Sequence, residues 1–307
     1  FSPYFTLYLQ SLAFSAWDIG VLMSLMQLMR LLAPNLWGWL ADRLGAKTPI
    51  VRGAALMSLA GFSCFFLAQS FAGFFLGMAL LAFFWSAALP LVEALTFTHL
   101  GAQANRYGAI RLWGSVGFIA AVLGLGWLLE RLPLAAILWV SVTILGGILA
   151  CAMALPEKRE DRHETDRQPI SDILRRREVK TLFAACFLMS AAHGALYVFY
   201  SIHLVSRGYG TTLVGFLWTL GVVAEIVVFL YLPRLFHRFS LRAILLFSFA
   251  CGVARFLMIG WGVEWLAVVV LAQLLHAATF GAYHASAVAA VNRWFAGRHQ
   301  EIGRASC

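Results

Sequence analysis

Long uninterrupted apolar runs constrain this chain more than any other feature of its sequence. About ten such runs occur, each near the ~20 residues that an α-helix needs to cross a bilayer. Apolar residues make up 62% of the 307 and charged residues only 12%, whereas soluble domains contain about 45–50% and about 25%. Because the runs are continuous rather than alternating, they predict helices and exclude a membrane β-barrel. The sequence therefore predicts an all-α polytopic membrane protein.

Basic residues are distributed unevenly between the loops that join these runs. The net charge is +9, but Lys and Arg gather in alternate loops, and only Arg131 and Arg207 fall on the sparse side. Under the positive-inside rule the crowded side is cytoplasmic. The charge therefore reports topology, and no nucleic-acid partner is expected. The crowded side carries Arg43, Lys47, Arg106, the segment 156–180, Arg234, Arg238, Arg242, Arg293 and Arg298.

The polar segment 156–180 divides the apolar runs into two blocks. Its mixed charges are typical of a solvated cytoplasmic linker. We expect an N-terminal helical bundle over 1–155 and a C-terminal bundle over 181–295. The last seven residues, 301–307, match the translation of a sequencing-adapter sequence, so we expect a non-native tail there. The predicted helices cover about 1–14, 19–41, 49–69, 71–99, 108–129, 134–155, 181–206, 211–233, 243–263 and 265–292.

The stretch from Gly38 to Lys47 is the most specific motif. Gly38 permits close helix approach and Gly45 permits a tight reversal. Asp42 can accept hydrogen bonds at a helix N-terminus, and Arg43 marks the cytoplasmic side. The pattern Gly-x-Leu-Ala-Asp-Arg-x-Gly-x-Lys resembles the loop after the second helix in the major facilitator superfamily of transporters, where it is a gating motif. A plain polar hairpin between two membrane helices is the alternative.

This resemblance implies a fold of two six-helix bundles around a central cavity. A weak internal repeat agrees with it, because Ile19-Gly20 corresponds to Val214-Gly215 and the motif corresponds to 233–242. The superfamily has twelve helices, so we expect about ten of the twelve here, with the last two missing.

Ionisable residues within the apolar runs are candidates for function. Each costs about 2.5–3.5 kcal/mol at a helix centre on insertion scales, so each needs a partner or a task. Structural pairing is the alternative for every one of them. The candidates are Arg30, Glu93, Arg111, Glu225 and Arg255, together with His193, His276 and His284.

Two of these residues fall in a segment that resembles lactose permease. The stretches 90–94 and 106–117 are similar to its helix 4–5 region, which implies that Glu93 and Arg111 form the charged part of a substrate site. Arg255 and His276 match members of its proton-coupling cluster.

The same resemblance breaks down at two acidic positions. Val222 and Thr279 stand where that permease has its helix 8 and helix 10 acids. Glu225 lies on the same helical face as Val222 and is expected to take over a carboxylate role. The predicted proton-coupling set is therefore Glu225, Arg255, His276 and Arg30, with either Arg255 or His276 as the group that modulates Glu225.

A closer resemblance is to the phenylpropionate permease family. It rests on 111–116, on 215–225 and on the pair Ala192-His193, and it implies import of aromatic acids with protons. An aromatic carboxylate needs a cation and a flat apolar wall. Arg111, Arg30 or Arg255 could supply the cation. The wall could come from Trp113, Tyr197, Tyr200 and Trp218, with His193 on the helical face of the two tyrosines, although packing alone also explains such a stripe.

The sequence thus predicts a proton symporter of a small organic acid in a bacterial inner membrane. A symporter of sugars or nucleosides is the alternative, as is a non-transporting membrane sensor on the same fold. We expect no enzyme, because no nucleophile–base pair or metal-ligand spacing occurs. No cofactor and no metal are expected. The expected partners are a small-molecule substrate, protons and membrane lipid, and the protein is expected to be a monomer.

Overall fold

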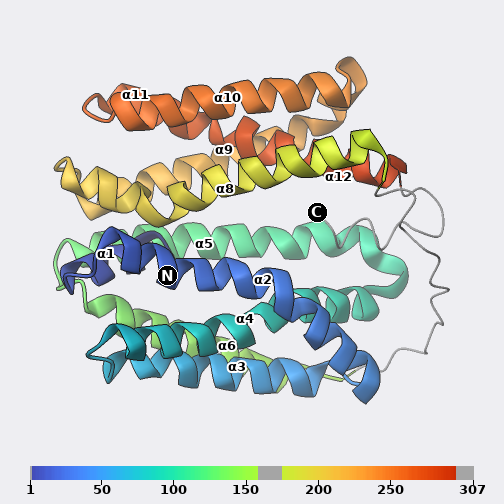
Figure 1. The fold of residues 1–307 in the computed structure, drawn as a ribbon. Coiled ribbons are helices and arrows are strands. Elements are labelled where there is room, and N and C mark those ends of the chain that lie inside the picture. Colours follow the sequence, from blue (N-terminus) through green and yellow to red (C-terminus); the bar gives the residue numbers. More distant parts are fainter. Residues whose placement is uncertain (1, 158–174, 295–307) are drawn as a thin grey trace. The chain divides into compact units, whose positions relative to one another are not determined.

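A computed structural model describes residues 2–157 and 175–294 (Figure 1). The chain divides into two units, one formed by residues 1–118 and 128–163 and the other by residues 119–127 and 164–307. Most of the predicted linker, 158–174, and the predicted tail, 301–307, lie outside the described residues.

Helices account for every regular element in the described part of the chain. Nine helical spans in this part are long and apolar enough to cross a membrane, and two of them, Thr48–Phe66 and Leu266–Val291, combine consecutive elements. The first block contains α1 (Ser2–Ser11), α2 (Ala16–Leu44), α3 (Thr48–Ser63), η1 (Cys64–Phe66), α4 (Phe71–Leu100), η2 (Gly101–Arg106), α5 (Tyr107–Leu129) and α6 (Ala136–Ala154). The second contains α8 (Arg177–Ser206), α9 (Thr211–Arg238), α10 (Leu241–Trp261), α11 (Leu266–Leu274), η3 (Ala277–Ala282) and α12 (Tyr283–Trp294).

Most predicted helices match within about four residues at each end, and two differ more. The helix predicted over 211–233 continues through Pro233 to Arg238, because a membrane helix tolerates an internal proline when neighbouring groups satisfy its backbone. The helix predicted over 265–292 is interrupted by the π-helical segment η3. No proline marks this interruption, so it could not be predicted from a helix-breaking residue.

The pattern of exposed and buried side chains is typical of a protein that is surrounded by lipid. Trp17, Leu31 and Phe187 are 80%, 75% and 72% exposed, whereas Arg255 is 1% exposed and is the largest fully buried side chain. In water such a surface would cause aggregation, but in a bilayer it contacts acyl chains. The structure therefore supports a multi-pass membrane protein.

Close packing of α3 on α4 depends on Gly61. A Cβ added to Gly61 would lie 2.9 Å from the backbone nitrogen of Leu81 and 3.1 Å from the Cβ of Leu80. Small residues allow membrane helices to approach in this way. Gly53 lies on the same helix, and a Cβ added there meets nothing within 4 Å.

We expect Gly61→Val to destabilise the first unit by about 1–3 kcal/mol or more, because the added methyl groups must push α4 away. Gly53→Val is the matched control and should leave stability unchanged. Thermal unfolding of both variants, purified in detergent, checks the prediction. Equal unfolding temperatures for the two variants would contradict it.

Candidate functional site

A cluster of buried polar side chains lies inside the second unit. Among the described residues, the charged or imidazole side chains that are buried are His193 on α8, Arg255 on α10 and His276 at the start of η3. Gln273 and Thr279 lie beside them and are also buried. Burying such groups in a membrane protein is costly, so a cluster of them marks a site with a task.

Arg255 is held by neutral acceptors. Its Nη1 donates to Thr279 Oγ1 at 3.1 Å and lies 3.4 Å from His193 Nε2, and its Nη2 donates to Gln273 Oε1 at 3.1 Å. No ion pair to Arg255 occurs within the described residues. In the described part of the chain, the positive charge of this buried guanidinium therefore has no carboxylate within ion-pair distance.

Glu225 pairs with His276. The Oε2 of Glu225 lies 3.6 Å from His276 Nε2, and the two side chains are 18% and 9% exposed. Of the two modulators that the sequence left open, the structure places His276 beside the carboxylate. Two glycines make room for this pair: a Cβ on Gly281 would lie 3.2 Å from Glu225 Cγ, and one on Gly221 would lie 3.3 Å from His276 Cδ2.

Residues at the start of the π-helical segment η3 and within it contact both Glu225 and Arg255. His276, which precedes it, faces Glu225 on α9, while Thr279 within it accepts from Arg255 on α10. Thr279 Oγ1 also donates to the His276 carbonyl at 3.4 Å. Single π-helical turns widen a helix and occur frequently at functional sites. This turn connects the arginine to the carboxylate–imidazole pair.

An aromatic wall stands next to the cluster. Tyr197 stacks on Trp218 with ring centroids 5.8 Å apart, and Tyr200 meets Trp218 edge-on at 5.3 Å. Trp218 Nε1 donates to Ser201 Oγ at 3.1 Å, which fixes the indole. The His193 ring lies 5.9 Å from the Tyr197 ring. The structure therefore brings together the aromatic residues that share one face of α8 and the tryptophan of α9.

A second polar pair lies where α4 and α5 meet. Arg111 Nε lies 4.0 Å from Glu93 Oε1, with the side chains 55% and 38% exposed. The hydroxyl of Tyr107 donates to the same oxygen at 2.7 Å. Trp113, predicted as part of the wall, is 74% exposed on α5. Arg30 is exposed and contacts only Gln27 of its own helix within the described residues, at 3.5 Å.

Comparison with known proteins identifies the family. The model of the MFS_1 like family matches residues 1–306. The chain belongs to the MFS_1-like family. It is therefore a multi-pass secondary transporter of the major facilitator superfamily, and not an enzyme.

Relatives of this MFS_1-like chain carry different cargo names. A "Probable 3-phenylpropionic acid transporter" of Escherichia coli is 31% identical over 297 residues, covering 94% of this chain and 76% of the relative. A "Maltose permease" of Geobacillus stearothermophilus is 30% identical over 257 residues, which cover 83% of this chain and 65% of the permease. The crystal structure of the nucleoside transporter NupG superposes with a TM-score of 0.81 at 15% identity, covering 98% of this chain and 80% of NupG, which shows the shared fold.

The predicted gating motif of this MFS_1-like transporter forms the C-terminal end of α2. Gly45 follows α2 in the left-handed conformation, with φ 62° and ψ 20°, and its amide donates to the Ala41 carbonyl. Asp42 and Arg43 are exposed in the last turn of α2. The close helix approach predicted at Gly38 is not seen, because a Cβ there would meet nothing within 4 Å.

The N-terminus of α3 is capped by a residue that sequence reasoning missed. Glu157 accepts from the amides of Lys47 and Thr48 at 3.3 and 3.0 Å, so it takes the role predicted for Asp42. Arg52 Nη2 donates in turn to the Leu155 carbonyl at 2.8 Å, beyond the end of α6. A carboxylate at one helix start and a cation at another helix end both suit the helix dipoles. No local pattern relates Glu157 to α3.

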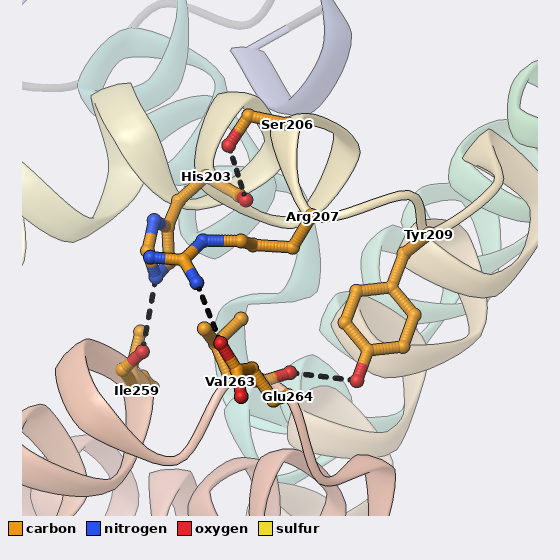
Figure 2. A network of polar contacts seen from close by, with 7 residues as sticks. All are labelled: His203, Ser206, Arg207, Tyr209, Ile259, Val263 and Glu264. Carbon is orange, nitrogen blue, oxygen red and sulfur yellow. Dashed lines mark hydrogen bonds and ion pairs between the residues drawn. The ribbon is translucent and has the colours of Figure 1, made fainter.

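Polar contacts tie the end of α8 to the turn between α10 and α11 (Figure 2). His203 Nε2 lies 3.1 Å from the Ile259 carbonyl, and the hydroxyl of Tyr209 donates to the Val263 carbonyl at 2.7 Å. Arg207 pairs with Glu264 at 3.0 Å, with side chains 45% and 68% exposed. These contacts lie on the predicted non-cytoplasmic side, and the His203 contact joins α8 to α10.

Tyr107 is the residue of the Glu93–Arg111 pair that sequence reasoning missed. Its ring stacks on Phe97 at 4.4 Å, so Tyr107→Phe should keep the ring in place and remove the hydroxyl that donates to Glu93. We expect the KM of transport to rise about five-fold, the equivalent of about 1 kcal/mol for one hydrogen bond. The concentration dependence of uptake measures this. An unchanged KM would show that the hydroxyl does not support the pair.

Proposed function

We propose that this transporter is a proton-coupled symporter of small organic acids in a bacterial inner membrane, with aromatic carboxylates such as 3-phenylpropionate as cargo. It would work by alternating access between the bundles 1–155 and 181–295, joined by the linker 156–180, and as a monomer. The observation that carries the proposal is the uncompensated cation of Arg255, buried beside an aromatic wall and a carboxylate–imidazole pair. The 31% identical relative named for 3-phenylpropionic acid supports the cargo.

The cargo chemistry fits this environment. A carboxylate is attracted to a guanidinium whose hydrogen-bond partners, as far as the chain is described, are all neutral. The phenyl ring of the cargo would pack against Tyr197 and Trp218, which are stacked in this structure. Glu93 on α4, with Arg111 and Trp113 on α5, would also take part in cargo binding. Gly38, Asp42, Arg43 and Gly45 would act in gating.

Proton coupling would reside in Glu225 and His276. A carboxylate and an imidazole at 3.6 Å can share one proton, and the charge of the pair then depends on the cargo and on access to either side of the membrane. A proton shared by the pair neutralises the charge of Glu225, which lowers the cost of holding the site inside the membrane while its access changes sides. Arg30 stays a further candidate for this step.

Uptake of labelled 3-phenylpropionate into cells that express the protein, with and without a protonophore, tests the function. We expect accumulation that collapses when the protonophore is added. Absence of uptake by a protein shown to be folded and present in the membrane would reject this cargo.

A sugar cargo is the second candidate. It is favoured by the 30% identity to a maltose permease and by the Glu93–Arg111 pair, since a carboxylate and a guanidinium together can bind hydroxyl groups. Competition for uptake by unlabelled maltose and by nucleosides distinguishes these cargoes. A protein that moves none of them would fit the sensor.

A further inference from the structure

His193 has its protonation pattern fixed by the groups around it. Its Nδ1 lies 2.9 Å from the Met189 carbonyl one helical turn earlier, and a carbonyl can only accept, so Nδ1 carries a hydrogen. Its Nε2 lies 3.4 Å from Nη1 of Arg255, which can only donate. Nε2 must therefore offer its lone pair. The contacts define a neutral imidazole with the hydrogen on Nδ1.

Among the described residues, no carboxylate pairs with His193 to favour its cationic form. From α10 it faces Arg255 and the edge of the Phe256 ring at 5.6 Å, and from the start of η3 it faces the His276 ring at 6.4 Å. Tyr197 on its own helix is the other neighbour. A second proton would set two cations 3.4 Å apart and replace the acceptor by a donor.

We propose that His193 is a positioning residue, a neutral acceptor that holds the Arg255 guanidinium in place, and that it does not itself contact the cargo. The sequence had placed His193 among the cargo-binding residues. Its side chain is 5% exposed and both ring nitrogens are engaged by protein groups, which leaves it no group with which to bind a ligand.

The position of Arg255 matters because Thr279 links this arginine to the carboxylate–imidazole pair of Glu225 and His276. Arg255 donates to Thr279, and Thr279 donates to the carbonyl of His276, whose ring pairs with Glu225. Met189, which orients His193, also packs on α10, since a Cβ on Gly252 would lie 3.4 Å from its Cε. His193 thus ties α8 to Arg255 and Thr279, and Thr279 bonds to the backbone of the residue that pairs with Glu225.

A spectroscopic test does not depend on which cargo is carried. Nitrogen NMR of the purified protein with ¹⁵N-labelled histidine reports which ring nitrogen carries hydrogen, and His193→Gln identifies the signal by its loss. We expect a neutral ring with hydrogen on Nδ1, and a shift of the Nε2 signal in Arg255→Met. A cationic ring, a hydrogen on Nε2, or an Nε2 signal unchanged in Arg255→Met would overturn the proposal.

A transport test addresses the consequence of this role and rests on the proposed function. His193→Phe removes the acceptor and keeps a ring of similar size, so we expect the KM to rise about ten-fold, as for a lost hydrogen bond to a charged group. His193→Gln restores an acceptor oxygen and should recover most of that loss. His237→Phe, at an exposed histidine in the last turn of α9, is the control and should leave the KM unchanged.

An equal rise in the KM of His193→Phe and His193→Gln would overturn the acceptor role, and so would an unchanged KM in both variants. If the wild-type protein carries no tested acid, the proposed cargo fails, and the NMR result still decides the role of His193.

Discussion

Glu225→Gln should abolish accumulation of the cargo against its gradient while exchange of cargo across the membrane continues. Glutamine keeps the size and hydrogen-bonding capacity of the protonated carboxyl group but cannot release a proton. The altered protein would therefore resemble a transporter that is permanently loaded. His276 would stay in its place, since the amide can still contact its Nε2 and the two packing glycines are unchanged.

The size of this effect follows from the driving force. A carboxylate that moves with one proton carries no net charge, so only the pH difference drives it. One pH unit is worth about 1.4 kcal/mol per proton, which sustains roughly ten-fold accumulation. We expect the wild-type protein to reach about this ratio and Glu225→Gln to fall to about one.

Glu264→Gln is the matched control for this prediction. Glu264 is an exposed acid in the turn between α10 and α11, paired with Arg207 at 3.0 Å, and an exposed pair contributes only about 0–1 kcal/mol. Its loss should leave accumulation unchanged. Wild-type accumulation by Glu225→Gln in vesicles with an imposed pH gradient would reject Glu225 as the proton carrier.

Arg255→Met should remove most of the cargo affinity. Methionine fills a similar volume without the charge, and removing one partner of a buried charged interaction costs about 2–5 kcal/mol, which corresponds to roughly a 30-fold or greater loss of affinity. Direct binding of labelled cargo to the purified protein measures the effect. Arg207→Met, which removes a half-exposed arginine from an exposed pair, should bind cargo as the wild type does.

Arg255→Lys separates loss of charge from loss of geometry. Lysine keeps the positive charge but cannot match a guanidinium that donates to Thr279 and Gln273 on different nitrogens. We expect intermediate affinity, with the protein still present in the membrane at wild-type amounts. Unchanged affinity in both Arg255 variants would show that the cation for the cargo lies elsewhere, with Arg111 as the next candidate.

Several features of the site follow from local sequence alone. Gly45 was predicted as a tight reversal because a residue in the left-handed conformation favours glycine, and it has φ 62°. His193, Tyr197 and Tyr200 were predicted to share a face because their spacing fits a helix, and their rings form a continuous set with Trp218. Glu93 and Arg111, by contrast, were expected together only from the resemblance to lactose permease, and they lie 4.0 Å apart.

The partners of Glu225 and Arg255 could not be derived in that way. The sequence left Arg255 and His276 as equal modulators of Glu225, and it gave no role to Gln273 as an acceptor. These contacts join α8, α9, α10 and η3, so they depend on how each helix is rotated and on the π-helical turn that shifts the residues after His276.

The apolar runs by themselves determined the membrane location, the helical class and most helix boundaries, and the loop motif indicated the family. Each of these follows from the length of a run or the spacing of a few residues. The rotation of each helix was decided only by tertiary structure. A helix in lipid is apolar nearly all round, so its sequence lacks the polar face that would reveal which side points inward. Packing at Gly61, Gly221 and Gly281, and hydrogen bonds to Arg255, supply that missing information.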